Sequence, residues 1–119
     1  MTNPRIGVIG AGWWSTDHHM PSLRSYDKAD FCAIAELKSA KLSKAADYFG
    51  IDLTFEDYKE MFATAKLDGV VIAVQHSYHY QIANHYSLHL FLNLSQINLK
   101  NQYFYHLYFD YHRNYLSYL

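Results

Sequence analysis

Three small residues near the N-terminus have a spacing that is typical of phosphate binding. Gly10, Gly12 and Ser15 lie in the segment R-I-G-V-I-G-A-G-W-W-S and match the pattern G-x-G-x-x-G, with serine in the third place. The first glycine permits a tight turn, the second lets the backbone approach a pyrophosphate, and the third small residue lets a helix pack close to the preceding strand. The N–H groups at that helix start then bind the phosphates. The spacing therefore predicts a dinucleotide site.

A carboxylate stands where such a site requires one. Glu36 lies 24 residues after Gly12 and directly follows the apolar run A-D-F-C-A-I-A. A carboxylate at the end of the second strand accepts hydrogen bonds from the adenosine ribose hydroxyls. Its charge would repel a 2′-phosphate and so favour NAD, whereas Lys38 is near enough to leave NADP open. The alternative interpretation is a solvated glutamate at a strand end.

Alternating strands and helices have to position these residues. Apolar runs predict strands over residues 5–10, 29–35, 53–54 and 69–74, and helical spacing predicts helices from Trp14 onward, over 39–49 and over 55–65. Pro21 should end or kink the first helix, and Gly50 should stop the second. The alternation predicts an α/β fold with a doubly wound parallel sheet of the Rossmann type.

Composition limits the classes of function. The chain has 119 residues and a net charge of −1, which does not favour nucleic acid or an anionic membrane as partner. Its single cysteine, Cys32, excludes a disulfide framework and is expected to be a small core residue in a reducing compartment. The apolar residues 6–9 are too few for a signal peptide, and no run approaches the roughly 18 residues of a membrane span. We therefore expect a cytoplasmic protein.

Four segments, in order, resemble the N-terminal domain of the glucose–fructose oxidoreductase, inositol dehydrogenase and MocA family of NAD(P)-dependent oxidoreductases. The segments are G-V-I-G-A-G-W-W-S followed by H-M-P-S-L, then A-I-A-E, then F-E-D-Y-K-E-M, and last L-D-G-V-V-I-A-V-Q-H-S-Y-H. The resemblance covers about residues 4–83. It implies an activity that transfers hydride between a nicotinamide and a sugar or polyol hydroxyl, with NAD or NADP as cofactor.

The resemblance also implies further site residues. In that family the loop after the fourth strand lies beside the nicotinamide, which places Val74, Gln75, His76 and His79 there. Val74 and Gln75 replace the usual Thr-Pro of the family. The neighbouring pair Trp13 and Trp14 is a candidate shield for the pyrophosphate, although packing against the sheet would explain at least one of the two rings.

The resemblance ends before the family's catalytic motif. A Glu-Lys-Pro motif, whose lysine serves catalysis, would fall near residues 96–98, where this chain has Gln96, Ile97 and Asn98. The family's second domain, which binds substrate, has no counterpart in the sequence. We therefore expect residues 1–94 to form a truncated cofactor domain without an assigned catalytic residue. The competing interpretation is a non-catalytic module for binding a nucleotide or a protein.

Residues 84–119 differ in composition from the rest of the chain. They contain no Gly, Pro, Ala or Val, and ten of the 36 are Tyr or Phe. We hypothesise an out-of-frame continuation, which a Glu-Lys-Pro motif in another frame of the downstream DNA would support and its absence would contradict. Leu88, Leu90, Leu92 and Leu94 alternate with other residues and predict a fifth strand. We expect residues 95–119 to be a poorly specified, irregular extension, through which copies could self-associate.

Two histidines in this region have a spacing seen in metal sites. Residues 80–89 can form the helix after the fourth strand, and on it His85 and His89 are four residues apart, which is a zinc-ligand spacing. No third ligand is evident, so we expect solvated histidines and no metal.

Overall fold

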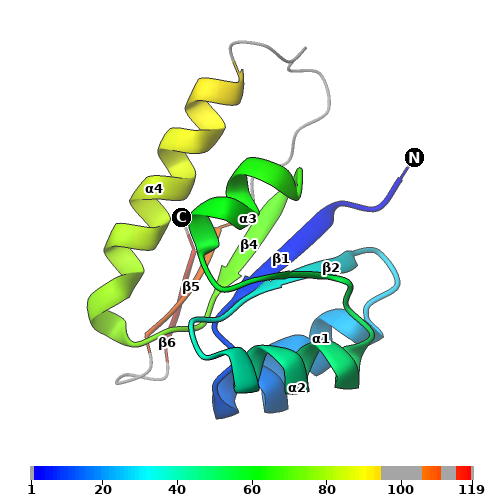
Figure 1. The fold of residues 1–119 in the computed structure, drawn as a ribbon. Coiled ribbons are helices and arrows are strands. Elements are labelled where there is room, and N and C mark those ends of the chain that lie inside the picture. Colours follow the sequence, from blue (N-terminus) through cyan, green and yellow to red (C-terminus); the bar gives the residue numbers. More distant parts are fainter. Residues whose placement is uncertain (1, 95–105, 111–114, 119) are drawn as a thin grey trace.

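One mixed sheet organises the molecule. The computed structural model describes residues 2–94, 106–110 and 115–118 (Figure 1). The strand order is β3-β2-β1-β4-β5-β6; the first five strands are parallel and β6 is antiparallel to β5. The strands are β1 (Arg5–Ile9), β2 (Asp30–Ala35), β3 (Leu53–Phe55), β4 (Gly69–Ile72), β5 (His106–Asp110) and β6 (Tyr115–Tyr118).

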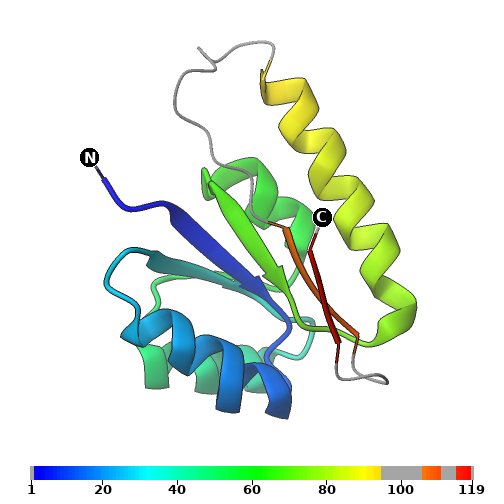
Figure 2. The same cartoon turned by 180° about the vertical axis from the view of Figure 1, so that it is seen from behind.

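Helices cover both faces of the sheet. A wide π-helical turn, η1 (Ser15–His19), leads into α1 (Met20–Ser25), and α2 (Ser39–Phe49), α3 (Tyr58–Thr64) and α4 (His76–Leu94) follow. Figures 1 and 2 show α1 and α2 on one face, with α3 and α4 on the other. The predicted doubly wound α/β fold is therefore confirmed.

Two apolar layers hold the helices on the sheet. Val8 of β1 faces the α1–α2 side, where it packs with Met20 and Leu42, and Ile9 faces the other side, where it packs with Met61. Burial of such a side chain stabilises the fold by about 1.5–3 kcal/mol. The period-2 alternation of β1 thus supplies both layers of the core at once.

A bulge interrupts that alternation in β2. Ile6 pairs with Phe31 but Gly7 pairs with Ala33, so Cys32 is an extra residue in the β2 strand. The Cys32 side chain is half-buried against the α3–α4 layer, and its Sγ lies 3.7 Å from the Ile6 carbonyl oxygen. Burial raises the pKa of this thiol, which keeps it protonated. The expectation of a packed, inert cysteine agrees with this placement.

The first helix continues through Pro21 instead of ending there. The Met20 N–H donates to the Ser15 carbonyl five residues back, which widens the helix just before the proline. A proline clashes with the carbonyl four residues earlier, and a wide turn is one of the ways in which helices accommodate such a clash. The helix then ends at Ser25.

The fifth strand predicted over residues 88–94 is wrong, because these residues belong to α4. Leucine is among the better helix formers, and Ile82, Ala83 and Tyr86 of the same helix are buried in the layer beside α3. The strand next to β4 is β5 instead, so part of the segment expected to be irregular completes the sheet. Predictions that concern residues 95–105, 111–114 and 119 lie outside the described residues.

Within the described part of the chain, no helix is long and apolar enough to cross a membrane.

Candidate functional site

The carboxyl ends of β1, β2 and β4 meet at one edge of the sheet. Ile9 pairs with Ala35 on one side and with Ile72 on the other, so the loops that follow these three strands are adjacent. In the sheet β2 lies on one side of β1 and β4 lies on the other, so the strand order reverses at β1. Ligands of open α/β sheets bind at such a reversal of strand order.

Gly10 is required by the fold itself. Its φ is +100°, a conformation that side chains other than glycine rarely adopt. A Cβ at this position would collide with the Ala73 carbonyl oxygen and would lie 2.8 Å from the carbonyl carbon. The Gly10 N–H donates to the Ala35 carbonyl over 2.8 Å. The first glycine of the pattern therefore closes the turn between the ends of β2 and β4.

Gly12 is different, because nothing in the described part of the chain requires a glycine there. Its φ is not positive, and beyond Gly12 and its two chain neighbours no heavy atom of the described residues lies within 4 Å of a Cβ built on it. The Gly12 carbonyl accepts the Thr16 N–H at 3.0 Å, so the helix begins immediately after it. The first N–H groups of a helix have no acceptor within the helix and carry partial positive charge. An open cradle for an anion thus lies beside Gly12.

The remaining residues of the turn close the site from the helix side. Ser15 is buried, and its hydroxyl has no hydrogen-bond partner among the described residues. Trp14 is half-buried, and its ring lies 4.1 Å from that of His18, centroid to centroid. Trp13 is 61% exposed and touches Trp14 edge-on. One of the two tryptophans therefore packs and the other stands at the rim of the site.

Glu36 reaches the glycine turn. Its Oε1 accepts the Ala11 N–H at 3.0 Å, and its Oε2 accepts the Lys38 N–H at 3.1 Å. The sequence pattern places Glu36 near the site but gives no sign of the bond to Ala11, because the donor is a backbone group. A carboxylate has about four acceptor positions, so two remain for other donors.

The loop after β4 is held by one histidine. His79 is buried, and its Nε2 lies 2.7 Å from the Val74 carbonyl oxygen. Because a carbonyl only accepts, Nε2 must carry the proton and donate it. Val74 is half-buried, whereas Gln75 and His76 are exposed at the same edge. His79 thus fixes the backbone at Val74, and Gln75 and His76 lie exposed in the segment between them.

The other histidines do not form a metal centre in the part of the chain that the structure describes, where no three potential ligands cluster. His85 and His89 lie on α4 with their rings against Phe62 of α3. Burial lowers the pKa of His89, with a further contribution from His85. Burial likewise lowers the pKa of His19, and neighbouring His18 adds to that effect.

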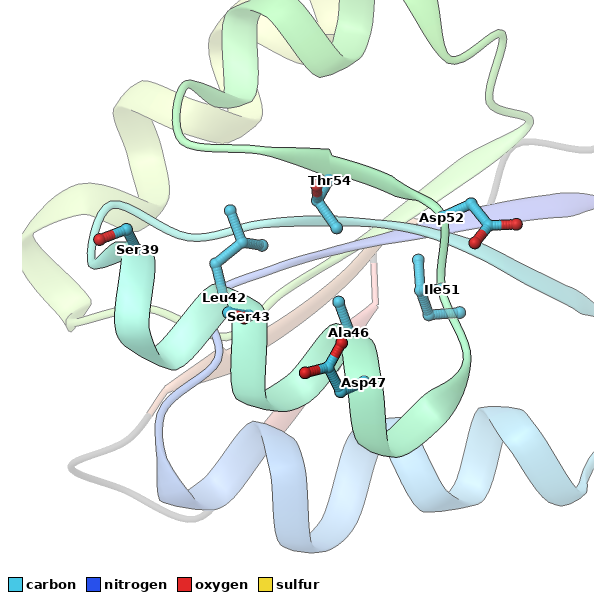
Figure 3. A pocket seen from close by; sticks show the side chains of 8 residues that line it. All are labelled: Ser39, Leu42, Ser43, Ala46, Asp47, Ile51, Asp52 and Thr54. Atoms are coloured by element: carbon cyan, nitrogen blue, oxygen red, sulfur yellow. The ribbon is translucent and has the colours of Figure 1, made fainter.

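A hollow elsewhere on the surface does not suit a phosphate. It has a volume of about 300 Å³ and lies between α2 and β3 (Figure 3). Its lining includes two carboxylates and neither a lysine nor an arginine: Ser39, Leu42, Ser43, Ala46, Asp47, Ile51, Asp52 and Thr54. None of the predicted site residues lines it.

Comparison with known proteins agrees with this geometry. Residues 4–89 match the oxidoreductase family with an NAD-binding Rossmann fold, Gfo/Idh/MocA. The chain belongs to this family. The matched residues contain β1, β2 and β4 and the turns that follow them, so the edge described above lies within the part of the chain that matches the NAD-binding domain.

The similar proteins are longer than this chain. The D-xylose 1-dehydrogenase [NADP(+)] of Haloarcula marismortui is 32% identical in an alignment of 84 residues that covers 65% of this chain and 22% of that protein. An oxidoreductase of Agrobacterium radiobacter, solved with NAD+, L-tartaric acid and magnesium, has a TM-score of 0.71 at 25% identity over 75% of this chain and 26% of its own. The scyllo-inositol dehydrogenase of Lactobacillus casei has the same fold, with a TM-score of 0.69 at 24% identity over 74% and 26%. This Gfo/Idh/MocA chain spans about a quarter of their length.

We expect Gly10→Ala to destabilise the protein by about 2–4 kcal/mol, because a positive φ and a backbone collision act together. Urea unfolding followed by circular dichroism measures this free energy. Gly12→Ala is the matched control and should change stability by no more than about 0.5–1 kcal/mol, since its Cβ enters open space. Equal losses in the two variants would contradict the distinction between the glycines.

We expect the free energy of unfolding to fall as the pH is lowered through about 6.5. The folded pKa of His19 is lowered from the ordinary 6.5, so the unfolded chain binds more protons between the two values. His89 acts in the same direction. Urea unfolding at neutral and at mildly acidic pH measures the difference in the free energy of unfolding between the two conditions. The His19→Gln variant should show a smaller difference. A pH dependence that is the same in His19→Gln and in the unaltered protein would contradict the prediction.

Proposed function

We propose that this chain binds NAD through the glycine turn, Glu36 and the loop after β4, as the cofactor domain of a sugar or polyol oxidoreductase. The open cradle beside Gly12 is the observation that carries the proposal. The fold does not require a glycine at this position, whereas a pyrophosphate that approaches the helix start does.

The glycine turn would bind the pyrophosphate. Gly10 closes the turn, Gly12 leaves room for the phosphates, and the small Ser15 lets the helix start lie close to β1. Trp13 and Trp14 would border the phosphates, with the exposed ring of Trp13 at the rim. These roles need only backbone donors and the field of the helix, which are the usual means of binding phosphate at such a turn.

Glu36 would accept hydrogen bonds from the adenosine ribose. Two of its acceptor positions are used by the Ala11 and Lys38 N–H groups, which leaves the others for the 2′- and 3′-hydroxyls. Its negative charge disfavours a 2′-phosphate, so NAD is the proposed cofactor. Lys38 has an exposed side chain nearby and leaves a weaker binding of NADP open.

The loop after β4 would face the nicotinamide. Gln75 and His76 are its exposed polar residues, Val74 is half-buried, and His79 fixes the loop from beneath through the Val74 carbonyl. The bound cofactor supplies the hydride chemistry. The chain's own residues bind and orient it.

Sugar or polyol substrates are proposed because relatives carry names such as D-xylose 1-dehydrogenase. No Glu-Lys-Pro motif occurs in this sequence, and we assign no catalytic residue. We place the protein in the cytoplasm, in keeping with its single, half-buried cysteine and its small net charge. Neither nucleic acid nor a membrane is a proposed partner.

A second candidate function is a non-catalytic binding module that self-associates. The strand order ends at β6, and the backbone groups at the edge of a sheet can pair with a second chain. A sedimentation experiment over a range of concentrations separates the two candidates, because only this one requires a dimer.

We expect NAD at 100 times its Kd to raise the free energy of unfolding by about 2.7 kcal/mol. NADP at the same concentration should raise it less. Gly12→Ala, which keeps the fold, should remove most of the NAD effect because its Cβ occupies the place of the pyrophosphate. Thermal or urea unfolding with and without each cofactor measures this. No stabilisation of the unaltered protein by either cofactor would refute the proposed function.

We expect the purified chain to show no turnover of xylose or inositol with NAD. The reason is that the sequence has no Glu-Lys-Pro motif, so it lacks the lysine that serves catalysis in the family it resembles. The measurement is the appearance of NADH absorbance under conditions where NAD binding has been verified. Turnover above the rate of a Gly12→Ala control would contradict this expectation.

A further inference from the structure

Glu36 ties two loops together through its side chain. Its two carboxylate oxygens accept N–H groups from Ala11, in the turn after β1, and from Lys38, just before α2. The Glu36 side chain is half-buried, and the bond to Ala11 spans 25 positions in the chain. Such a bond restrains the tertiary placement of the turn, unlike a contact between sequence neighbours.

With the bond to Ala11, each of the three consecutive residues of the turn is held by a hydrogen bond. The preceding N–H, that of Gly10, is bonded to the Ala35 carbonyl, and the carbonyl of the following residue, Gly12, accepts the Thr16 N–H just before the helix begins. Ala11 lies between two glycines, the residues with the greatest backbone freedom. Without Glu36, no other described group holds the Ala11 N–H in place. A turn ordered before binding loses less entropy when the ligand arrives.

We propose that Glu36 is a positioning residue for the phosphate-binding turn, in addition to any contact with the ribose. It holds the Ala11 N–H away from the ligand and so directs the next N–H groups, at the helix start, toward the phosphates. This inference rests on the proposed NAD function, but the ordering of the turn by Glu36 exists without cofactor and is measurable without it.

The negative charge of Glu36 is expected to weaken cofactor binding, whereas its positioning of the turn is expected to strengthen it. A carboxylate near a pyrophosphate repels it, so removal of Glu36 relieves repulsion while it releases the turn. Glu56 is the matched control: it is an exposed glutamate that directly follows β3, the neighbour of β2, and Glu56→Ala removes the same charge. Glu36→Gln removes the charge but keeps one oxygen that can accept the Ala11 N–H.

Hydrogen exchange of backbone amides, followed by NMR on the protein without cofactor, tests the positioning directly. In Glu36→Ala the Ala11 amide should exchange at least about ten times faster, while the Gly10 amide, bonded to Ala35, stays slow. Glu36→Gln should restore most of the protection, and Glu56→Ala should change neither amide. An Ala11 amide that exchanges equally in the unaltered protein and Glu36→Ala overturns the proposal. If Glu36→Ala loosens the entire sheet, the Glu36→Gln variant decides instead. The proposal is contradicted if the Ala11 amide of Glu36→Gln exchanges fast while its Gly10 amide stays protected, because the side-chain oxygen of Gln should have restored the bond to Ala11.

An NAD analogue without the 2′- and 3′-hydroxyls on its adenosine ribose separates positioning from ribose binding. If Glu36 only binds ribose, Glu36→Ala leaves the Kd of the analogue unchanged or lower. If Glu36 positions the turn, the Kd of the analogue rises by about ten-fold in Glu36→Ala and by less in Glu36→Gln. Glu56→Ala gives the effect of charge alone. If the unaltered protein binds neither NAD nor the analogue, the proposed function fails, and the exchange of the Ala11 amide still decides whether Glu36 orders the turn.

Discussion

The close approach of Gly10 to the backbone of Ala73 is the contact on which the rest of the site depends. Because Gly10 has no side chain, the end of β1 lies directly beside the end of β4, and the Ala73 N–H donates to the Ile9 carbonyl at 2.8 Å. The Gly10 N–H meets β2 on the other side. Three strand ends are thereby fixed relative to one another, and the helix start, Glu36 and the loop after β4 follow from their positions.

The two glycines of the sequence pattern are therefore subject to different physical constraints. Gly10 satisfies the backbone, since its conformation and its neighbours exclude a Cβ, whereas Gly12 has neither constraint within the described chain. A pattern match alone treats the two positions as equivalent. The structure distinguishes a glycine that the protein needs in order to fold from one that the described fold does not require.

Patterns along the chain predicted the regular elements well, and tertiary effects explain where they failed. The α2 bounds, 39–49, follow from apolar spacing and from Gly50, which adopts a left-handed φ of 68° after the helix. The alternating leucines of residues 88–94 led to the wrong prediction of a strand. A short run of apolar residues with period 2 can also occur in a helix, when other residues of that helix decide which of its faces is buried. The extra residue at Cys32 and the wide turn before Pro21 depend on register and backbone hydrogen bonds, which no side-chain pattern records. The glycine spacing and the carboxylate after the second strand predicted Gly10, Gly12 and Glu36 as site residues. Their backbone hydrogen bonds leave no trace in that pattern.

Both loops that flank the end of β1 are held by side chains that the family pattern associates with the cofactor. Glu36 bonds to the backbone of the glycine turn, and His79 bonds to the backbone of the loop after β4. Each polar group thus satisfies a backbone partner at the edge of the sheet, where strand pairing no longer does so. A ligand that binds at this edge meets loops whose shape these two bonds already restrict, so removal of either side chain would loosen a loop as well as remove a polar group. The carboxyl edge of the sheet thus continues the backbone hydrogen bonding of its strands through side chains.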